Sequence, residues 1–124
     1  MLLKLSKTSL NFYSELYGDA LKSGRKSATI RLGDKSDKYA TGQIVWVTLG
    51  PRYSRRKKLF AALIDKVDVK PLADLSPRDI QRENPEFRNV EDVLKLMSQI
   101  YGEAIEPDRI ATVLYFSPVD EYDL

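Results

Sequence analysis

The chain has 124 residues, of which 43% are hydrophobic and 31% charged, and its net charge is +2. This length predicts one domain, residues 1–124, with a modest core, and no apolar run reaches membrane length. Because the sequence has no histidine and no cysteine, it excludes Ser-His-Asp and Cys-His catalysis, thiol redox chemistry and zinc sites made from those residues. No carboxylate spacing indicates another metal or a cofactor. The N-terminus is too short for a signal peptide, so we expect a soluble cytoplasmic protein with no membrane partner.

The first half of the chain predicts a strand, a helix and two further strands. Residues 2–5 form a short apolar run, and residues 9–22 carry apolar side chains at helical spacing before Gly24, a typical helix end. Alternation over residues 28–32 predicts a strand with its even-numbered residues facing the core. Residues 44–49, rich in β-branched and aromatic side chains, give the strongest strand signal in the chain.

The second half predicts a long strand, two helices and a closing strand. Residues 59–69 favour a strand with a bend near Asp65. Ser76-Pro77 begins a helix that must end by Asn84, because Pro85 follows. A second helix runs from near residue 89 to Gly102, and residues 109–116 alternate as a strand. Three consecutive middle strands favour an α+β fold: a small mixed or antiparallel sheet or β-barrel with flanking helices.

The segment from Gly24 to Arg31 gathers an amine, a hydroxyl and a guanidinium in one short element. Such a cluster can bind an anion. If the chain bends after Gly24, Lys26 can also act as the base for the Thr29 hydroxyl. That role requires a lowered lysine pKa, which burial or a neighbouring cation such as Arg25 or Arg31 supplies. The alternative is a solvated strand face, with Thr29 favoured for its β-propensity.

Glu83 stands out because it lies in the last turn of its expected helix, where the helix dipole disfavours a carboxylate. Residues that break a local rule cluster at functional sites. The alternative is a surface carboxylate paired with Arg78 or Arg82.

A basic segment follows the strongest strand. Residues 1–60 carry 13 basic and 4 acidic groups, whereas residues 61–124 carry 7 basic and 14 acidic groups. A basic face of this kind suits an anionic partner, unless the two halves interleave in the fold. The expected hairpin tip offers phosphate contacts and one aromatic ring for base stacking, or it is a solvated turn; its residues are Arg52, Tyr53, Arg55, Arg56, Lys57 and Lys58.

The pattern Gly24-x-Lys26-x-x-Thr29-x-Arg31 resembles that of the ASCH domain, a family with a PUA-like β-barrel fold. The order of elements, including a helix that ends in Glu83-Asn84, resembles the family over nearly the whole chain. The family is mostly regarded as RNA-binding. The chain looks most similar to small bacterial members that remove the acetyl group from the exocyclic amine of acetylated cytidine. It departs from the family at Gln43, where an acidic residue is common, and in a longer basic segment at residues 51–58.

The resemblance implies a specific division of roles. Thr29 would attack the acetyl carbonyl, Lys26 would accept its proton, and Glu83 would hold the cytosine edge or relay the proton to the leaving amine. Gly24, Arg25 and Arg31 would bind the substrate, which is RNA or a modified nucleoside. The alternatives are an RNA-binding module without chemistry, in which Lys26 and Arg31 hold phosphate, and a ribonuclease that uses the same pocket. The sequence does not specify an oligomeric state.

Overall fold

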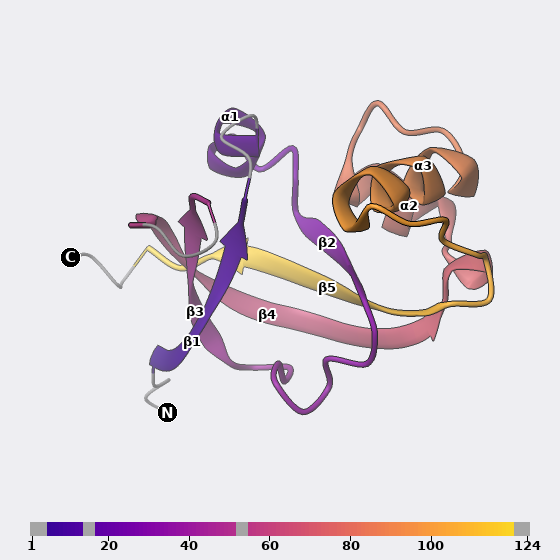
Figure 1. Ribbon diagram of the computed structural model, residues 1–124. Helices are drawn as coiled ribbons and strands as arrows, with labels where there is room; N and C mark the ends of the chain where they lie inside the picture. Colours follow the sequence, from indigo (N-terminus) through magenta and orange to yellow (C-terminus); the bar gives the residue numbers. More distant parts are fainter. Residues whose placement is uncertain (1–4, 14–16, 52–54, 121–124) are drawn as a thin grey trace.

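The computed structural model describes residues 5–13, 17–51 and 55–120. A mixed five-stranded sheet curls into a half-barrel, and three helices lie along it (Figure 1). The strands follow the spatial order β1-β3-β4-β5-β2 and have the bounds β1 (Leu5–Phe12), β2 (Ala28–Leu32), β3 (Ile44–Leu49), β4 (Lys57–Pro71) and β5 (Ile110–Pro118). The helices are α1 (Gly18–Lys22), α2 (Pro77–Glu83) and α3 (Val90–Tyr101), with a 3₁₀ turn η2 at Leu72–Asp74.

The expected α+β class with a PUA-like curled sheet is confirmed. Of the strand pairs in the described part of the chain, β1–β3 alone is parallel, whereas β2–β5, β3–β4 and β4–β5 are antiparallel. The register of β4 against β5 shifts between Ile64 and Lys66, which is the bend expected near Asp65. Strands β2 and β3 have the predicted bounds, β2 from its alternation and β3 from its β-branched and aromatic content.

The predicted helix over residues 9–22 is wrong in its first part. Residues up to Phe12 belong to β1, and among the described residues of this stretch only Gly18–Lys22 forms an α-helix. The spacing of the apolar residues in this stretch fits both a helix and a strand. Pairing with β3 makes the first part of the stretch a strand. Asn11 fixes that pairing, because its amide donates to Gly50 O at 3.1 Å and its carbonyl accepts from the Thr48 hydroxyl at 2.8 Å. Residues 2–4 of the expected first strand lie outside the described residues, and Leu5 begins β1.

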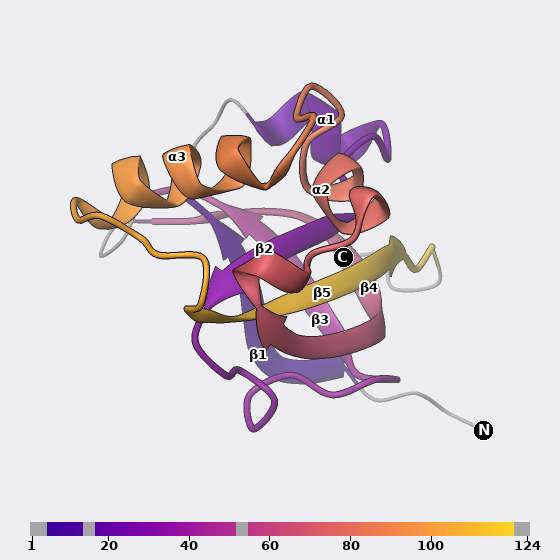
Figure 2. The same cartoon turned by 90° about the vertical axis from the view of Figure 1, so that its right-hand side faces the viewer.

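The core has two adjoining parts. One fills the curled sheet and includes Leu10, Val47 and Phe116. The other lies between the sheet and the helices, where Ile30 and Met97 are buried. Figure 2 shows α2 and α3 lying over β2 and β5. None of the described helices is long and apolar enough to cross a bilayer.

Local sequence explains the ends of the helices. Ser76 caps α2 through a reciprocal pair of hydrogen bonds with Asp79, and Pro77 occupies the first helical position. Helix α3 ends at Gly102, whose φ of 69° is left-handed. Helix α2 ends at Glu83, and this helix packs against β2.

Candidate functional site

The turn between α1 and β2 directs Lys26 into the protein. Gly24 has a φ of 79°, which a side chain disfavours, and the Lys26 amide donates to Ala20 O at 3.0 Å. Ser27 N–H donates to Arg82 O at 3.2 Å, so the turn is tied to the end of α2. A Cβ at Gly24 would meet no atom within 4 Å, which indicates that glycine is required there for its backbone angle.

Lys26 and Glu83 form a buried ion pair. Lys26 Nζ lies 2.7 Å from Glu83 Oε1, with side-chain exposures of 1% and 5%. The ammonium also donates to Glu83 O at 2.7 Å and to Ala28 O at 3.2 Å, so each of its three protons has an acceptor. Glu83 Oε2 accepts from Ile30 N–H at 2.7 Å. The reading of Glu83 as a surface residue paired with an arginine of its own helix is therefore wrong.

The burial of Lys26 acts against its charged form. Burial lowers the pKa of Lys26, and the adjacent Glu83 carboxylate opposes this shift only in part. The Lys26 ammonium lies 4.9 Å from the ring centre of Tyr17 and 5.4 Å from that of Phe12. Aromatic faces attract a cation but do not replace water fully. A lysine with a lowered pKa inside a cavity is a candidate base.

Thr29 is buried next to this pair and is held by Arg31. Arg31 Nε–H donates to Thr29 Oγ1 at 3.0 Å, and its terminal nitrogen donates to Asn11 O at 2.9 Å. The guanidinium lies 5.0 Å from the Phe12 ring centre. A guanidinium that donates to a hydroxyl oxygen stabilises the alkoxide form of that oxygen. Among the described contacts, no hydrogen bond joins Lys26 directly to Thr29.

One cavity of about 900 Å³ contains all three expected catalytic side chains. Lys26, Thr29 and Glu83 line it, as do Arg25 and Arg31. The structure thus brings the three predicted residues into one cavity. Their chemical roles stay predictions. The described residues hold no group of three or more acidic side chains suited to a metal ion.

Other polar residues of the cavity were not expected. They come from β1, α1, the loop after β2 and the end of α2: Asn11, Tyr17, Lys35, Lys38, Tyr39 and Asn84. Asn11 was missed because its strand was read as a helix. Tyr39 was missed because it lies in a polar loop, where a buried aromatic ring is not expected. Its ring is buried, and its hydroxyl donates to Ser9 O at 3.0 Å.

The described part of the basic segment, residues 55–58, does not line this cavity. Arg52 and Tyr53 lie outside the described residues. Arg55 and Arg56 are exposed, and Lys57 and Lys58 begin β4, paired with Leu49 and Thr48. Phosphate binding by this segment stays a prediction.

Three solved structures share the fold over most of the chain. The crystal structure of an ASCH domain from Lactobacillus crispatus JV V101 covers 90% of this chain and 80% of its own, with a TM-score of 0.65 and 13% identity. The fold is that of an ASCH domain. Protein EF3133 from Enterococcus faecalis V583, of family DUF984, covers 94% of this chain and 83% of its own, with a TM-score of 0.67 and 21% identity. Hypothetical protein PH0355 covers 90% of this chain and 97% of its own, with a TM-score of 0.64 and 18% identity.

The ASCH-like fold rests on structure, since neither the protein-family models nor the curated proteins give a match to the sequence. At these identities the likeness establishes the architecture alone. Any activity must therefore be argued from the cavity itself.

Proposed function

We propose that this protein is an ASCH-domain amidohydrolase that removes the acetyl group from an acetylcytidine-type nucleoside. The observation that carries the proposal is the buried Lys26–Glu83 pair beside the Thr29 hydroxyl in one cavity. Lys26 and Glu83 are 57 residues apart in sequence and come from different elements. A nucleophile, a candidate base and a carboxylate in one cavity are the groups that acyl transfer needs.

The chemistry proceeds in two steps. Thr29 Oγ1 attacks the acetyl carbon while Lys26, in its neutral form, accepts the hydroxyl proton. The bond from the acetyl carbon to the cytosine amine breaks, and the amine leaves with that proton, relayed through Lys26 and Glu83. Water then hydrolyses the Thr29 ester and releases acetate. Arg31, already donating to Thr29 Oγ1, stabilises negative charge on that oxygen.

The base role requires a change in the hydrogen bonds of Lys26. In the resting arrangement its three acceptors are Ala28 O and two oxygens of Glu83. Loss of one proton frees a lone pair, and rotation about the last side-chain bond directs that lone pair toward the cavity. The lowered pKa of Lys26 makes this deprotonation cheaper than for a solvated lysine.

The second candidate is an RNA-binding module, and one observation favours it. Besides the paired Lys26, four cations line the cavity, namely Arg25, Arg31, Lys35 and Lys38, against only Asp19 and Glu86 apart from Glu83. A basic cavity suits a phosphate backbone as well as a nucleoside. A ribonuclease that uses the same cavity is the third outcome. For all three candidates we propose RNA or its modified nucleosides as partners and a cytoplasmic location.

One experiment separates these candidates. The protein is incubated with acetylcytidine and, in parallel, with single-stranded RNA, and the products are resolved by chromatography. Release of cytidine and acetate supports the amidohydrolase. RNA fragments without deacetylation support the ribonuclease. Retention of intact RNA, with a steep salt dependence and no product in either reaction, supports the binding module.

A further inference from the structure

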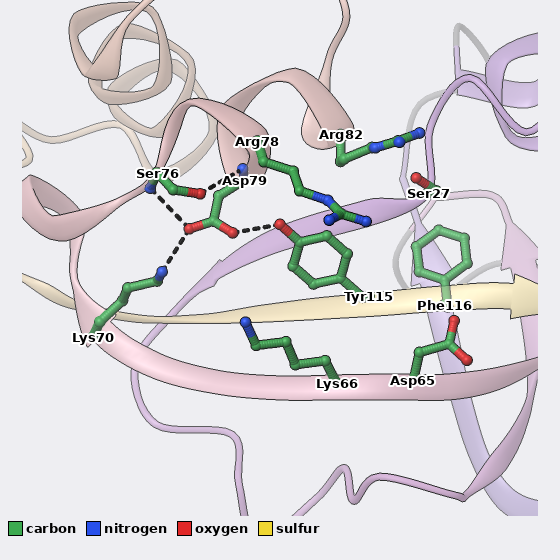
Figure 3. A pocket seen from close by; sticks show the side chains of 10 residues that line it. All are labelled: Ser27, Asp65, Lys66, Lys70, Ser76, Arg78, Asp79, Arg82, Tyr115 and Phe116. Atoms are coloured by element: carbon green, nitrogen blue, oxygen red, sulfur yellow. Dashed lines mark hydrogen bonds and ion pairs between the residues drawn. The ribbon is translucent and has the colours of Figure 1, made fainter.

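A second hollow, the groove between α2 and the β4–β5 strands, has a volume of about 630 Å³, and Figure 3 shows the side chains that line it. Lys26 and Glu83 line the cavity of about 900 Å³ described above. Their chain neighbours Ser27 and Arg82 line this groove instead. Tyr115 on β5 and Asp79 on α2 lie at its centre. Its lining residues are Ser27, Asp65, Lys66, Lys70, Ser76, Arg78, Asp79, Arg82, Tyr115 and Phe116.

At the centre of the groove, Asp79 accepts hydrogen bonds from three neighbouring residues. The Tyr115 hydroxyl donates to Asp79 Oδ1 at 2.5 Å. Asp79 Oδ2 receives the Lys70 ammonium at 2.6 Å and the Ser76 N–H at 2.9 Å. Burial and the bond to Asp79 raise the pKa of Tyr115 to about 12, so the phenol keeps its proton. The carboxylate of Asp79 is therefore engaged and does not neutralise the remaining cations.

Among the described residues, three cations of the groove have no carboxylate within hydrogen-bond distance: Lys66, Arg78 and Arg82. Lys66 Nζ lies 5.7 Å and Arg78 Cζ 5.8 Å from the ring centre of Tyr115. Figure 3 shows the Arg78 side chain extending toward that ring and the Lys66 side chain passing below it. Lys66 has only a 3.9 Å contact with Asp68. In the described part of the chain, neither Arg78 nor Arg82 forms a salt bridge. In Figure 3 the Arg82 side chain extends toward Ser27.

We infer that this groove binds a phosphate group. Two guanidinium groups and an ammonium around one hollow match the oxygens of a phosphate, and guanidinium groups bind them in pairs. Asp65 opposes an anion from the far end of the groove, where its carboxylate accepts from the Ser117 hydroxyl at 3.1 Å. The volume exceeds that of one phosphate, so there is room for an attached nucleoside or chain. The inference stands independently of the proposed hydrolysis.

The test is an NMR titration that follows the side-chain Nε–H signals of the arginines. Inorganic phosphate is added in one series and a short single-stranded oligonucleotide in another. We expect saturable shifts at Arg78 and Arg82. The double variant Arg78→Gln/Arg82→Gln should weaken phosphate binding by at least about tenfold. Asp65→Asn should strengthen it, because that change removes the opposing charge and retains an acceptor for Ser117.

The matched control is Arg88→Gln/Lys95→Gln, which removes the same charge from exposed positions outside both hollows. It should change the affinity by less than about twofold. An equal loss in the control, shifts confined to Arg25 and Arg31, or no saturable shift with either ligand would overturn the inference. Binding of the oligonucleotide above that of phosphate, lost in the groove variant, would identify a nucleic-acid phosphate. Equal binding of the two would identify free phosphate.

Discussion

Lys26 Nζ and Glu83 Oε1 are 2.7 Å apart and both side chains are almost completely buried. A buried ion pair is costly to desolvate, and packed apolar residues often stabilise a fold as well or better. Its presence in a cavity of a small domain is therefore a stronger argument for function than for stability. The two residues nevertheless depend on each other, because either charge alone would lack a partner.

Glu83→Gln should destabilise the protein by about 3–5 kcal/mol near neutral pH, since it leaves the Lys26 charge buried and unpaired. Urea unfolding measures this change. Lys26→Met/Glu83→Gln is the matched control and should be clearly less destabilised than the sum of the two single changes. Additive effects would mean that the two groups do not interact energetically.

The same Glu83→Gln variant should become more stable as the pH rises. The pKa of Lys26 lies below its unfolded value of 10.5 because of burial, and removal of Glu83 takes away the influence that raises it. Between the folded and unfolded pKa values the unfolded chain binds more protons, so stability increases with pH. Urea unfolding at several alkaline pH values should show this increase beginning at a lower pH than in the wild type. An increase that begins at the same pH in both proteins would contradict the prediction.

Deacetylation should require both Lys26 and the hydroxyl of Thr29. Lys26→Ala and Thr29→Val should each reduce kcat/KM for acetylcytidine by at least about 100-fold. Thr29→Ser keeps the hydroxyl and should retain much more activity than Thr29→Val. Circular dichroism must show that each variant is folded. A folded Lys26→Ala protein with a tenth of wild-type activity, a barrier change of only about 1.4 kcal/mol, would exclude Lys26 as the base.

The sequence predicted most elements because their signals are local. Ser76-Pro77 and Gly102 mark helix ends through their own backbone and side-chain chemistry. Most of β1, up to Phe12, was missed because its pairing partner β3 is distant in sequence, and no local pattern specifies parallel pairing. The bent segment at Gly24 could be anticipated, but its connection to Arg82 O could not.

The site shows the same limit. Lys26 and Thr29 were recognisable from their motif, and Glu83 from its unfavourable place at a helix end. The contact of Arg31 with Thr29 joins side chains two residues apart on one strand face. Its further bond to Asn11 O depends on β1, which local spacing did not identify.

Asp79→Asn should lower the free energy of unfolding by about 1–3 kcal/mol at pH 7, because three donors lose a charged acceptor. Burial alone would raise the pKa of Asp79, but the bonds from Lys70, Tyr115 and Ser76 hold it below its usual 3.8. The extra free energy of unfolding that ionised Asp79 gives the wild type is therefore fully present above pH 3.8. It is lost as the pH falls through the pKa of Asp79 in the folded protein. Urea titrations from pH 7 to 3 measure it. Asp37→Asn, at an exposed position, is the control and should show no comparable loss.

Exposed basic residues before and at the start of β4 should contribute to RNA affinity if they bind phosphates. Arg55→Ala/Arg56→Ala/Lys57→Ala should weaken single-strand binding and reduce the log–log salt slope by about 0.7 for each lost contact. The control Lys22→Ala/Arg88→Ala/Lys95→Ala removes the same charge from other exposed positions. An unchanged slope in the first variant would mean that the segment is only a solvated turn.

Activity on a free nucleoside should survive the triple change of Arg55, Arg56 and Lys57. A nucleoside carries no phosphate, and these residues are not among those that line the cavity around Lys26. The ratio of kcat/KM for acetylcytidine to the affinity for RNA should therefore rise in this variant. Loss of nucleoside turnover in a correctly folded triple variant would instead connect the segment to the chemistry, and binding and catalysis could not be assigned to separate surfaces.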